Sequence, residues 1–319
     1  MIKAITQKGV LTVGYVGLGI RGNATVGSIL QEVHDGDTIT VRALGNLSVR
    51  FLGVDAPEIS LTLPNEIVFT SIGNEKWEKF LENPFASNLP PFTPPLTKDL
   101  AFHLQSKLKN RTAINHFYHA QKAEDTLEEE LKKDLHALHQ SEKEFTLFLA
   151  FAHEVMDRYG RLLCFINRNQ VSKEDPEPRP LTYNERLLRL GKVMPYFIWP
   201  NINPFRKQKN IVDAVPQPGT ANTIVNKEGT LGRAREWVQH ARQRQIGIYD
   251  ETNPLQIEPF EVRFLARRRP PDRWVIDLSK NDNILIQPQR YYRVSHSEDR
   301  LFIPPEYVPL FLEAGWQHG

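Results

Sequence analysis

Short apolar segments separated by turn residues dominate the first part of the chain. Between residues 25 and 54, Asp-Gly and Gly-Asn pairs separate three runs of apolar and β-branched residues, VGSILQEV, DTITVRAL and LSVRFLGV. Such runs with hairpin-turn residues between them predict a three-stranded antiparallel meander. Two later runs, EFTLFLAFAHEV and RLLCFINR, flank a turn at residues 157–160 and predict a further pair of strands.

Helical periodicity follows the predicted meander. Leucines at four-residue spacing predict a helix within residues 97–123, and a Thr126-x-x-Glu129 capping box predicts the start of another. Helices are also predicted at 183–191 and 230–245. Strands and helices in this order predict an α+β fold, a five-stranded OB-type β-barrel with packed helices.

Changes in residue composition and in the pattern of apolar positions divide the chain into segments. We expect an N-terminal extension at 1–26 and a barrel domain at 27–250 with an irregular loop at about 204–226. A long helical insertion at about 59–122 begins with a proline-rich stretch and forms either a lid or a surface decoration. The runs FEVRFLA, RWVIDLS and RYYRV resemble strands, so residues 251–319 are predicted to form a small β-rich module.

Composition and charge narrow the classes of protein. With 40% hydrophobic and 24% charged residues the chain is globular, and a net charge of +2 gives no sign of a nucleic-acid partner by itself. Locally, residues 179–245 carry twelve Lys and Arg against four Asp and Glu, whereas 59–156 carry ten against fourteen. The basic segment predicts a face for a phosphate backbone, with a merely solvated helix surface as the alternative.

The cysteine content and the apolar segments indicate where the protein resides. Cys164 is the only cysteine and lies in an apolar run, so we expect a buried thiol and no disulfide framework. The apolar stretch 9–20 is too short to span a bilayer and runs into Arg21 without a usual cleavage site. We therefore expect no membrane partner and a cytoplasmic protein, with secretion as the alternative.

Three further patterns suggest ligands less specifically. Gly17, Gly19 and Gly22 match a dinucleotide-binding fingerprint, but β-branched residues and turns follow them, which favours a glycine-rich strand pair. Two His-x-x-His pairs could bind a metal or be purely structural, and one arginine cluster could bind nucleic acid or lie at an interface. They are His116 with His119, His136 with His139, and Arg263, Arg267, Arg268, Arg269 and Arg273.

Three charged motifs occur in a specific order. They are DGDT at 35–38, VRFLGVDAPE at 49–58 and DRYGR at 157–161. In this order they resemble the signature segments of the staphylococcal-nuclease-like (thermonuclease) family. NERLLRLG at 184–191 and ARQRQIGIYD at 241–250 resemble the helices that follow in that family. The resemblance covers 28–58, 124–201 and 230–250, and it implies a nuclease on an OB-type barrel.

The resemblance also implies a metal site. Asp37 and Asp55 match carboxylates that hold calcium, with the carbonyl of Ala56 as a further ligand. Glu58 matches the residue usually assigned as general base. Oxygen donors of this kind suit a hard ion such as calcium, and magnesium fits the same donor set.

The remaining matched residues imply contacts with the substrate. Arg50 and Arg161 match two arginines on the scissile phosphate, a role that suits the planar, permanently charged guanidinium. Arg158 and Tyr159 match substrate contacts, with arginine at a position that is often lysine. Where the family has a tyrosine six residues after the helix-ending glycine, this chain has Phe197, next to Tyr196. We expect one of these two rings to stack on the nucleotide, with a core role as the alternative.

These residues together predict a calcium-dependent nuclease that hydrolyses phosphodiester bonds of DNA, RNA or both. Such a reaction needs charge neutralisation, a positioned water and a proton acceptor, and the matched residue types supply each of these. By resemblance, the products carry 3′-phosphate and 5′-hydroxyl ends. The alternative is a non-catalytic module that binds nucleic acid or protein on the same barrel. The presence of all five matched polar residues, at positions 37, 50, 55, 58 and 161, favours the enzyme.

Overall fold

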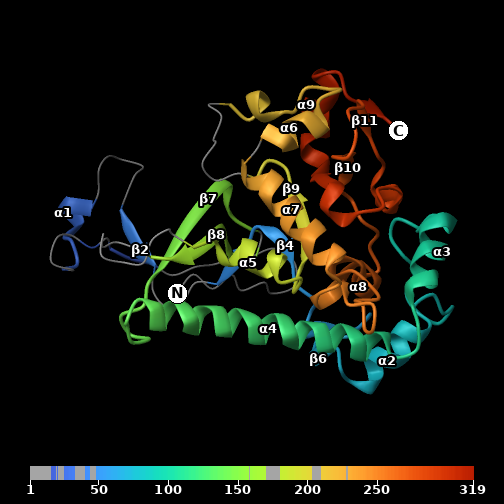
Figure 1. The fold of residues 1–319 in the computed structure, drawn as a ribbon, viewed down its shortest axis with the longest axis horizontal. Helices are drawn as coiled ribbons and strands as arrows, with labels where there is room; N and C mark the ends of the chain where they lie inside the picture. The colour runs from blue at the N-terminus through green and yellow to red at the C-terminus, as the bar shows by residue number, and fades with distance from the viewer. Residues whose placement is uncertain are drawn as a thin grey trace. The chain divides into compact units, whose positions relative to one another are not determined.

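The computed structural model describes most of the chain from residue 48 onward and parts of the chain before it. The described residues are 16–18, 20, 25–32, 40–43, 48–157, 159–169, 180–202, 210–227 and 229–319. They form a mixed α+β structure, which confirms the α+β class of the prediction (Figure 1). The chain divides into two compact units, Met1–Arg50 with Glu154–Cys164, and Phe51–His153 with Phe165–Gly319.

The first unit contains an antiparallel strand pair. β1 (Val16–Leu18) pairs with β2 (Val41–Ala43), and Gly17 lies opposite Arg42. Gly17 is therefore part of a strand, as the strand-pair alternative predicts. The predicted strand VGSILQEV is wrong at its centre, because Ile29–Glu32 forms the short helix α1. A local turn explains the difference, since the backbone N–H of Ser28 donates to the Gln31 side chain at 2.9 Å.

Most of the other predicted strands are confirmed. β7 (Leu147–Met156) and β8 (Leu162–Arg168) correspond to the runs on either side of the turn at 157–160. With β3 (Val49–Phe51) they form a three-stranded sheet in the order β3-β8-β7. Cys164 on β8 is buried, as expected, and burial raises the pKa of its thiol to about 11.

A four-stranded sheet lies in the core of the second unit. Its strands, in spatial order, are β10 (Trp274–Asp277), β12 (Arg300–Ile303), β9 (Met194–Ile198) and β4 (Gly53–Asp55). β9 pairs antiparallel with β4 and parallel with β12. The strands of the C-terminal segment therefore continue the sheet that contains Asp55. The sheets of the described residues do not join into a closed barrel.

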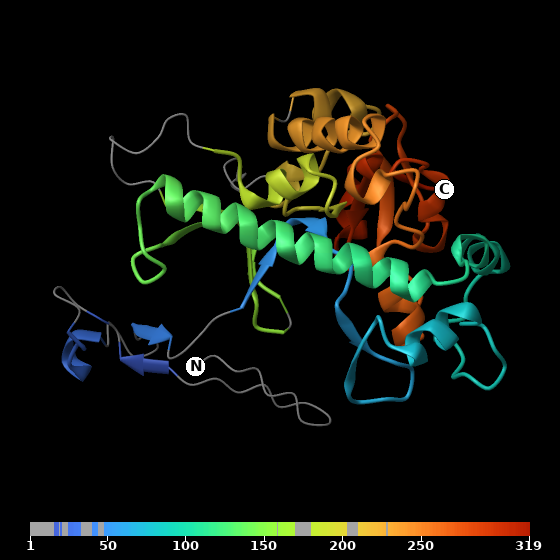
Figure 2. The ribbon, with the colours of Figure 1, turned by 60° about the horizontal axis from the view of Figure 1, so that its bottom comes forward.

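Residues 59–137 add a β-hairpin and three helices to the second unit. They are β5 (Ser60–Thr62), β6 (Phe69–Ser71), α2 (Glu75–Glu82), α3 (Lys98–Lys107) and α4 (Thr112–Ala137). The predicted helix at 97–123 is broken between α3 and α4, where Arg111 adopts a left-handed conformation at φ 67°. Figure 2 shows α4 as one long helix that crosses the unit. The predicted capping box is wrong, because Thr126 lies inside α4 and donates to the Lys122 carbonyl at 2.7 Å.

The next helical elements after β8 are α5 (Tyr183–Arg189), the 3₁₀ turn Val212–Ala214, α6 (Ala221–Lys227), α7 (Gly229–Gln243) and the 3₁₀ turn Gly247–Tyr249. Of these, α5 and α7 confirm the helices predicted at 183–191 and 230–245. Gly191 ends the α5 segment at φ 61°, and a Cβ there would lie 2.5 Å from the Ile246 carbonyl oxygen. Glycine is therefore required at this turn. The predicted irregular loop at 204–226 contains α6, while residues 203–209 lie outside the described part.

The C-terminal segment is more helical than predicted. Its remaining elements are α8 (Pro259–Arg267), β11 (Ile284–Leu285), the 3₁₀ turns Pro288–Arg293, Ser297–Asp299 and Pro305–Tyr307, α9 (Val308–Glu313) and β13 (Gln317–His318). The predicted strand FEVRFLA is wrong, because Glu258 and Glu261 form a capping box around Pro259 and start α8. The predicted strand RYYRV is also wrong and forms a 3₁₀ turn after Pro288, whereas RWVIDLS contains β10 as expected.

A buried network of salt bridges and hydrogen bonds connects α4 to α5 and β8. Asp134 on α4 accepts hydrogen bonds from Arg186 at 2.7 Å, Arg168 at 3.2 Å and the Tyr183 hydroxyl at 2.7 Å. All four side chains are buried. Paired charges therefore join α4, which lies in the acidic segment 59–156, to α5, which lies in the basic segment 179–245. Within the described residues no helix has the length and apolarity that a membrane crossing requires.

Two threonines, one at a helix N-cap and one that matches a capping residue only in the sequence, allow a direct test. Thr182 accepts from the Glu185 backbone N–H at 3.2 Å, and Glu185 caps in return. Thr182→Ala is expected to lower the free energy of unfolding by about 1 kcal/mol, because it leaves helix N–H groups without a partner. Thr126→Ala, in the interior of α4, is expected to cost at most about half as much. Urea denaturation of both variants measures the difference, and an equal or larger loss for Thr126→Ala would contradict the assignment.

Candidate functional site

Two of the predicted site residues meet at an arginine that the resemblance does not include. Arg263 on α8 donates to both carboxylate oxygens of Asp55, each at 2.8 Å, and to Oε1 of Glu58 at 2.7 Å. The Asp55 side chain is fully buried, that of Glu58 is 25% exposed and that of Arg263 15%. The two carboxylates raise the pKa of Arg263 even though burial opposes its charge. One guanidinium thus bridges both acids.

The backbone around these acids is fixed by β4 and α4. Asp55 is the last residue of β4, which pairs with Met194 of β9. Ala56, the predicted carbonyl ligand, follows it and is half-buried. The backbone N–H of Glu58 donates to Nε2 of His116 at 2.9 Å, so this imidazole is neutral. His116 therefore positions the segment that carries Glu58.

The buried His116 gives the site a pH-dependent stability. Burial lowers the pKa of His116 from 6.5 to about 3, because it disfavours the charged imidazolium. Between these pH values the unfolded chain binds a proton that the folded chain does not, so this residue makes stability fall as the pH falls. The slope is up to about 1.4 kcal/mol per pH unit. We expect His116→Gln, which keeps an acceptor, to flatten the dependence of unfolding free energy on pH between 7 and 5.

Urea denaturation at several pH values tests this contribution. His240→Gln serves as the matched control, because His240 is exposed on α7 and should leave the slope as in the native chain. An unchanged slope in His116→Gln would contradict the assignment of a neutral His116.

The two histidine pairs show no arrangement typical of a metal site in the described residues. Nε2 of His119 donates to the Asn253 carbonyl at 2.8 Å, as the carbonyl can only accept. The rings of His136 and His139 lie 6.3 Å apart between centroids. No group of three or more His, Cys, Asp or Glu side chains in the described residues is arranged to hold a metal.

The two candidate stacking residues differ in exposure. Phe197 is 3% exposed and belongs to the hydrophobic core, which corresponds to the alternative considered for the aromatic run. Tyr196 is half-buried, and its hydroxyl interacts with Arg273 at 2.5 Å. The same guanidinium lies 5.4 Å from the centroid of the Tyr196 ring. Of the two rings, Tyr196 is the one that reaches the surface.

The predicted phosphate-binding residues belong to the first unit. Arg161 donates from Nε to Asp157 at 2.8 Å and lies 5.4 Å from the centroid of the Tyr159 ring, which is 49% exposed. Although partial burial opposes ionisation, hydrogen bonds from Arg161 and Tyr159 lower the pKa of Asp157. Arg50 lies on β3 and is half-buried. The predicted residues Asp37 and Arg158 lie outside the described residues.

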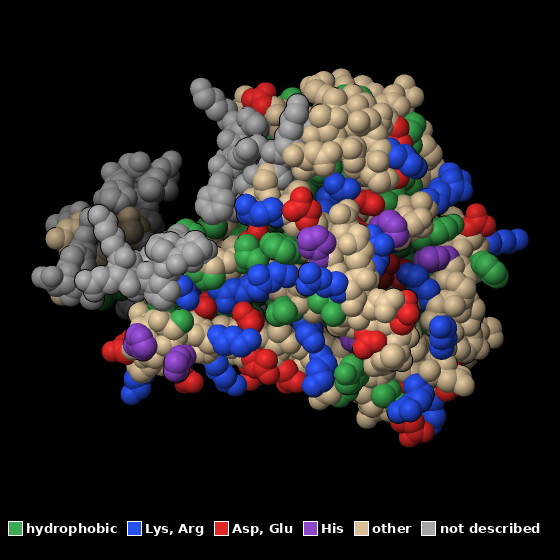
Figure 3. Space-filling model, in the orientation of Figure 1, with side chains coloured by type: hydrophobic (Ala, Val, Ile, Leu, Met, Phe, Trp, Pro, Cys, Tyr) green, Lys and Arg blue, Asp and Glu red, His purple; other side chains and the backbone are tan. Residues whose placement is uncertain are grey.

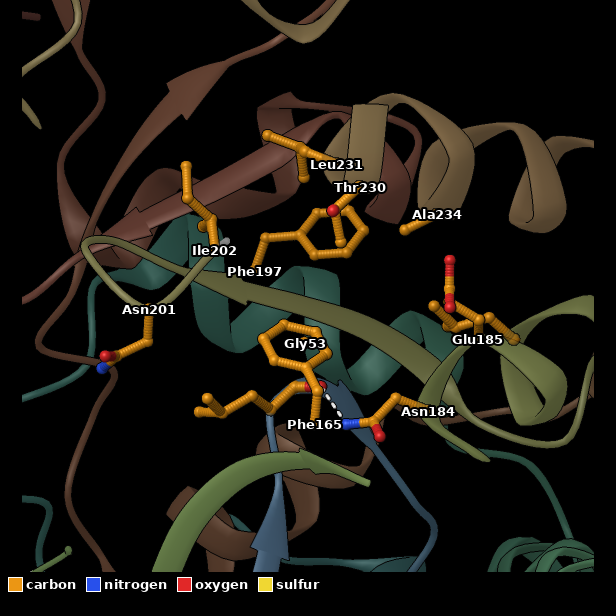
Figure 4. Close-up of a pocket in the computed structure, with 12 residues that line it drawn as sticks. Gly53, Phe165, Asn184, Glu185, Phe197, Asn201, Ile202, Thr230, Leu231 and Ala234 are labelled. Atoms are coloured by element: carbon orange, nitrogen blue, oxygen red, sulfur yellow. Dashed lines mark hydrogen bonds between the residues drawn. The ribbon is translucent and has the colours of Figure 1, made fainter. Parts of the chain in front are cut away.

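A small apolar cavity of about 20 Å³ lies beside β4 and β9. Figure 4 shows residues that line it, among them Phe165, Phe197, Leu231 and Asn184. The Asn184 side chain donates to the Leu52 carbonyl at 2.8 Å and accepts from the Ile166 N–H at 3.0 Å. No Lys or Arg is among the lining residues, so no cationic side chain of this cavity could pair with a phosphate.

The basic face predicted from the sequence lies on α5 and α7. Figure 3 shows Lys and Arg side chains gathered over α5, with both charge signs along α4. Arg189 and Arg244 are exposed, and Arg189 lies 5.6 Å from the centroid of the Trp237 ring. Arg233 is 53% exposed although it contacts Glu185 at 3.1 Å. Exposed cations beside an indole ring suit a phosphate backbone with bases.

Arg263 is the site residue that sequence reasoning missed. The sequence shows the arginine cluster around it, but it predicts the run FEVRFLA to be a strand of a separate module. The signal that could have placed it is the Glu-Pro-x-Glu start of α8. No protein-family model matches this chain, and no curated protein matches its sequence significantly.

Proposed function

We propose that this chain is a nuclease that hydrolyses phosphodiester bonds of DNA, RNA or both, leaving 3′-phosphate and 5′-hydroxyl ends. We also propose the thermonuclease-like family and its OB-type barrel for it, on the strength of the three motifs in order. The observation that carries the proposal is that Asp55 and Glu58, the acids of the second motif, bind the same guanidinium, with Asp55 fully buried and Glu58 25% exposed.

Glu58 has the properties of a general base. Arg263 contacts one of its oxygens, and the side chain remains 25% exposed, so a water molecule can reach the carboxylate. A carboxylate held in place by its backbone bond to His116 can take a proton from an attacking water. On the resemblance alone, we assign to Arg50 and Arg161 the neutralisation of the charge that develops on the phosphate. Within their own unit, Asp157 accepts a hydrogen bond from Nε of Arg161 and orients it. Tyr159 and Tyr196 would contact the substrate.

The calcium that the resemblance implies does not fit the acids as they are arranged. Both oxygens of Asp55 and one of Glu58 are bonded to Arg263, and a calcium ion needs about six to eight oxygen ligands. On the resemblance and the donor types, we still propose a dependence on calcium or magnesium, which would require Arg263 to release these oxygens. The roles given above to the side chains do not depend on the ion.

A non-catalytic binding module is the second candidate. The salt bridges between Arg263 and the two acids favour it, because acids that are neutralised within the protein do not need a catalytic purpose. The exposed arginines of α5 and α7 would serve such a module equally well, since they suit a phosphate backbone in either case.

Incubation with plasmid DNA and with single-stranded DNA and RNA separates the two candidates. Each substrate is tested with calcium, with magnesium and with a chelator, and both cleavage and binding are recorded. Cleavage that Arg50→Ala abolishes would support the nuclease. Binding without cleavage under every condition would support the module.

A further inference from the structure

The acids of the candidate site hold an internal cation. Asp55 and Glu58 bring two negative charges to one point, and Arg263 contributes one positive charge through three hydrogen bonds of 2.7–2.8 Å. The paired geometry on Asp55 uses both ends of its carboxylate, which is the strongest arrangement an arginine can make with an acid. We propose that Arg263 is the built-in counter-ion of this pair and competes with divalent cations for it.

Burial makes the competition direct. Asp55 is fully buried, so no part of its carboxylate is left for a second cation while Arg263 is bonded to it. A calcium ion coordinates the same oxygen atoms that the guanidinium occupies. The ion and the guanidinium therefore exclude each other at Asp55, and the positive charge of Arg263 also repels an approaching divalent ion.

The helix that carries Arg263 is firmly held. Lys107 on α3 binds Glu261 at 2.6 Å and Glu258 at 3.3 Å, and Arg300 binds Glu258 at 2.9 Å. The neighbours Val262 and Leu265 are fully buried. Because α8 is fixed at its first turn, Arg263 is presented to the acids by the fold itself and not by a mobile surface chain.

A second arginine, Arg273, adds positive charge near Arg263. Arg273 interacts with the Tyr196 hydroxyl at 2.5 Å and lies close enough to Arg263 for the two positive charges to repel each other. Both arginines belong to the segment after residue 250, which the nuclease-like resemblance does not cover. The inference assigns to that segment a role in controlling the cation affinity of the site. This inference depends on the proposed function only in that the proposed function gives the two acids a catalytic role.

Calcium binding to the purified full chain, without nucleic acid, tests the proposal. Calorimetric titration with calcium chloride after chelator treatment gives the affinity, and the thermal unfolding midpoint with and without calcium gives a second readout. We expect Arg263→Met to bind calcium at least about tenfold more tightly than the native chain, which is a coupling of ordinary size. Arg263→Lys, which keeps a positive charge, should bind no more tightly than the native chain.

The acid partner supplies the matched control. In Asp55→Asn/Arg263→Met the gain in calcium affinity should disappear, because the fully buried ligand is lost. Where Arg263→Met does not fold without calcium, folding induced by calcium and followed by circular dichroism is the expected result. Equal calcium affinity in the native chain and in Arg263→Met would overturn the proposal, as would a gain that survives Asp55→Asn. A chain that cleaves no nucleic acid would refute the proposed function and leave this result standing.

Discussion

Asp55→Ala is expected to lower the free energy of unfolding by about 3–5 kcal/mol, because it leaves the guanidinium of Arg263 half-buried without its main partner. Asp55 is fully buried and accepts two of the three hydrogen bonds that Arg263 makes with the acids. The loss should exceed that of any exposed ion pair in the chain, since such pairs are worth about 0–1 kcal/mol. Urea denaturation at neutral pH measures it.

Two comparisons separate this effect from ordinary loss of a side chain. Asp272→Ala removes an exposed acid of the same segment and should change stability by less than about 0.5 kcal/mol. The double variant Asp55→Ala/Arg263→Met should recover part of the loss, because no unpaired charge remains. Additive losses in the double variant would show that the two residues do not act as a pair.

Glu58→Gln is expected to lower kcat/KM for nucleic-acid hydrolysis by about 10³-fold, because a general base contributes roughly 10²–10⁴-fold. Glutamine has nearly the same shape and can still accept a hydrogen bond from Arg263, so the fold should persist. The measurement is the initial rate of cleavage of a fluorescent single-stranded oligonucleotide, with the thermal midpoint recorded for both proteins.

The matched control for this substitution is Glu66→Gln. Glu66 lies on the β5–β6 connection, where it pairs with the exposed Lys76 at 3.3 Å. This variant should cleave at the native rate. A Glu58→Gln protein that is folded and cleaves as fast as the native chain would remove Glu58 from the reaction.

The sequence predicted the elements whose signals are local and agree with each other. The β7–β8 pair follows from two apolar runs on either side of a turn, and α5 follows from its leucines and the glycine that ends it. Predictions failed where one local signal competed with another. Thr126 and Glu129 match a capping box, but the helical pattern before them continues and places Thr126 in the interior of α4.

The site itself depends on contacts between distant parts of the chain. Nothing near Asp55 in the sequence indicates that its partner lies at position 263, because β4 and α8 meet only through the tertiary fold. For the same reason the sequence could not decide whether Phe197 stacks on a ligand or packs in the core. The pairing of β9 with β4 and β12 places its side chain inside. The motifs therefore identify candidate site residues, whereas the tertiary fold determines which residues they bind and which of them are buried.

Analysis of the product ends tests the proposed nuclease most directly. An oligonucleotide of known sequence is incubated with the native chain and with Glu58→Gln, in calcium and in chelator, and the fragments are identified by mass spectrometry. The proposed function predicts fragments with 3′-phosphate and 5′-hydroxyl ends from the native chain and almost none from the variant. An oligonucleotide that is bound but stays intact in every sample would contradict it.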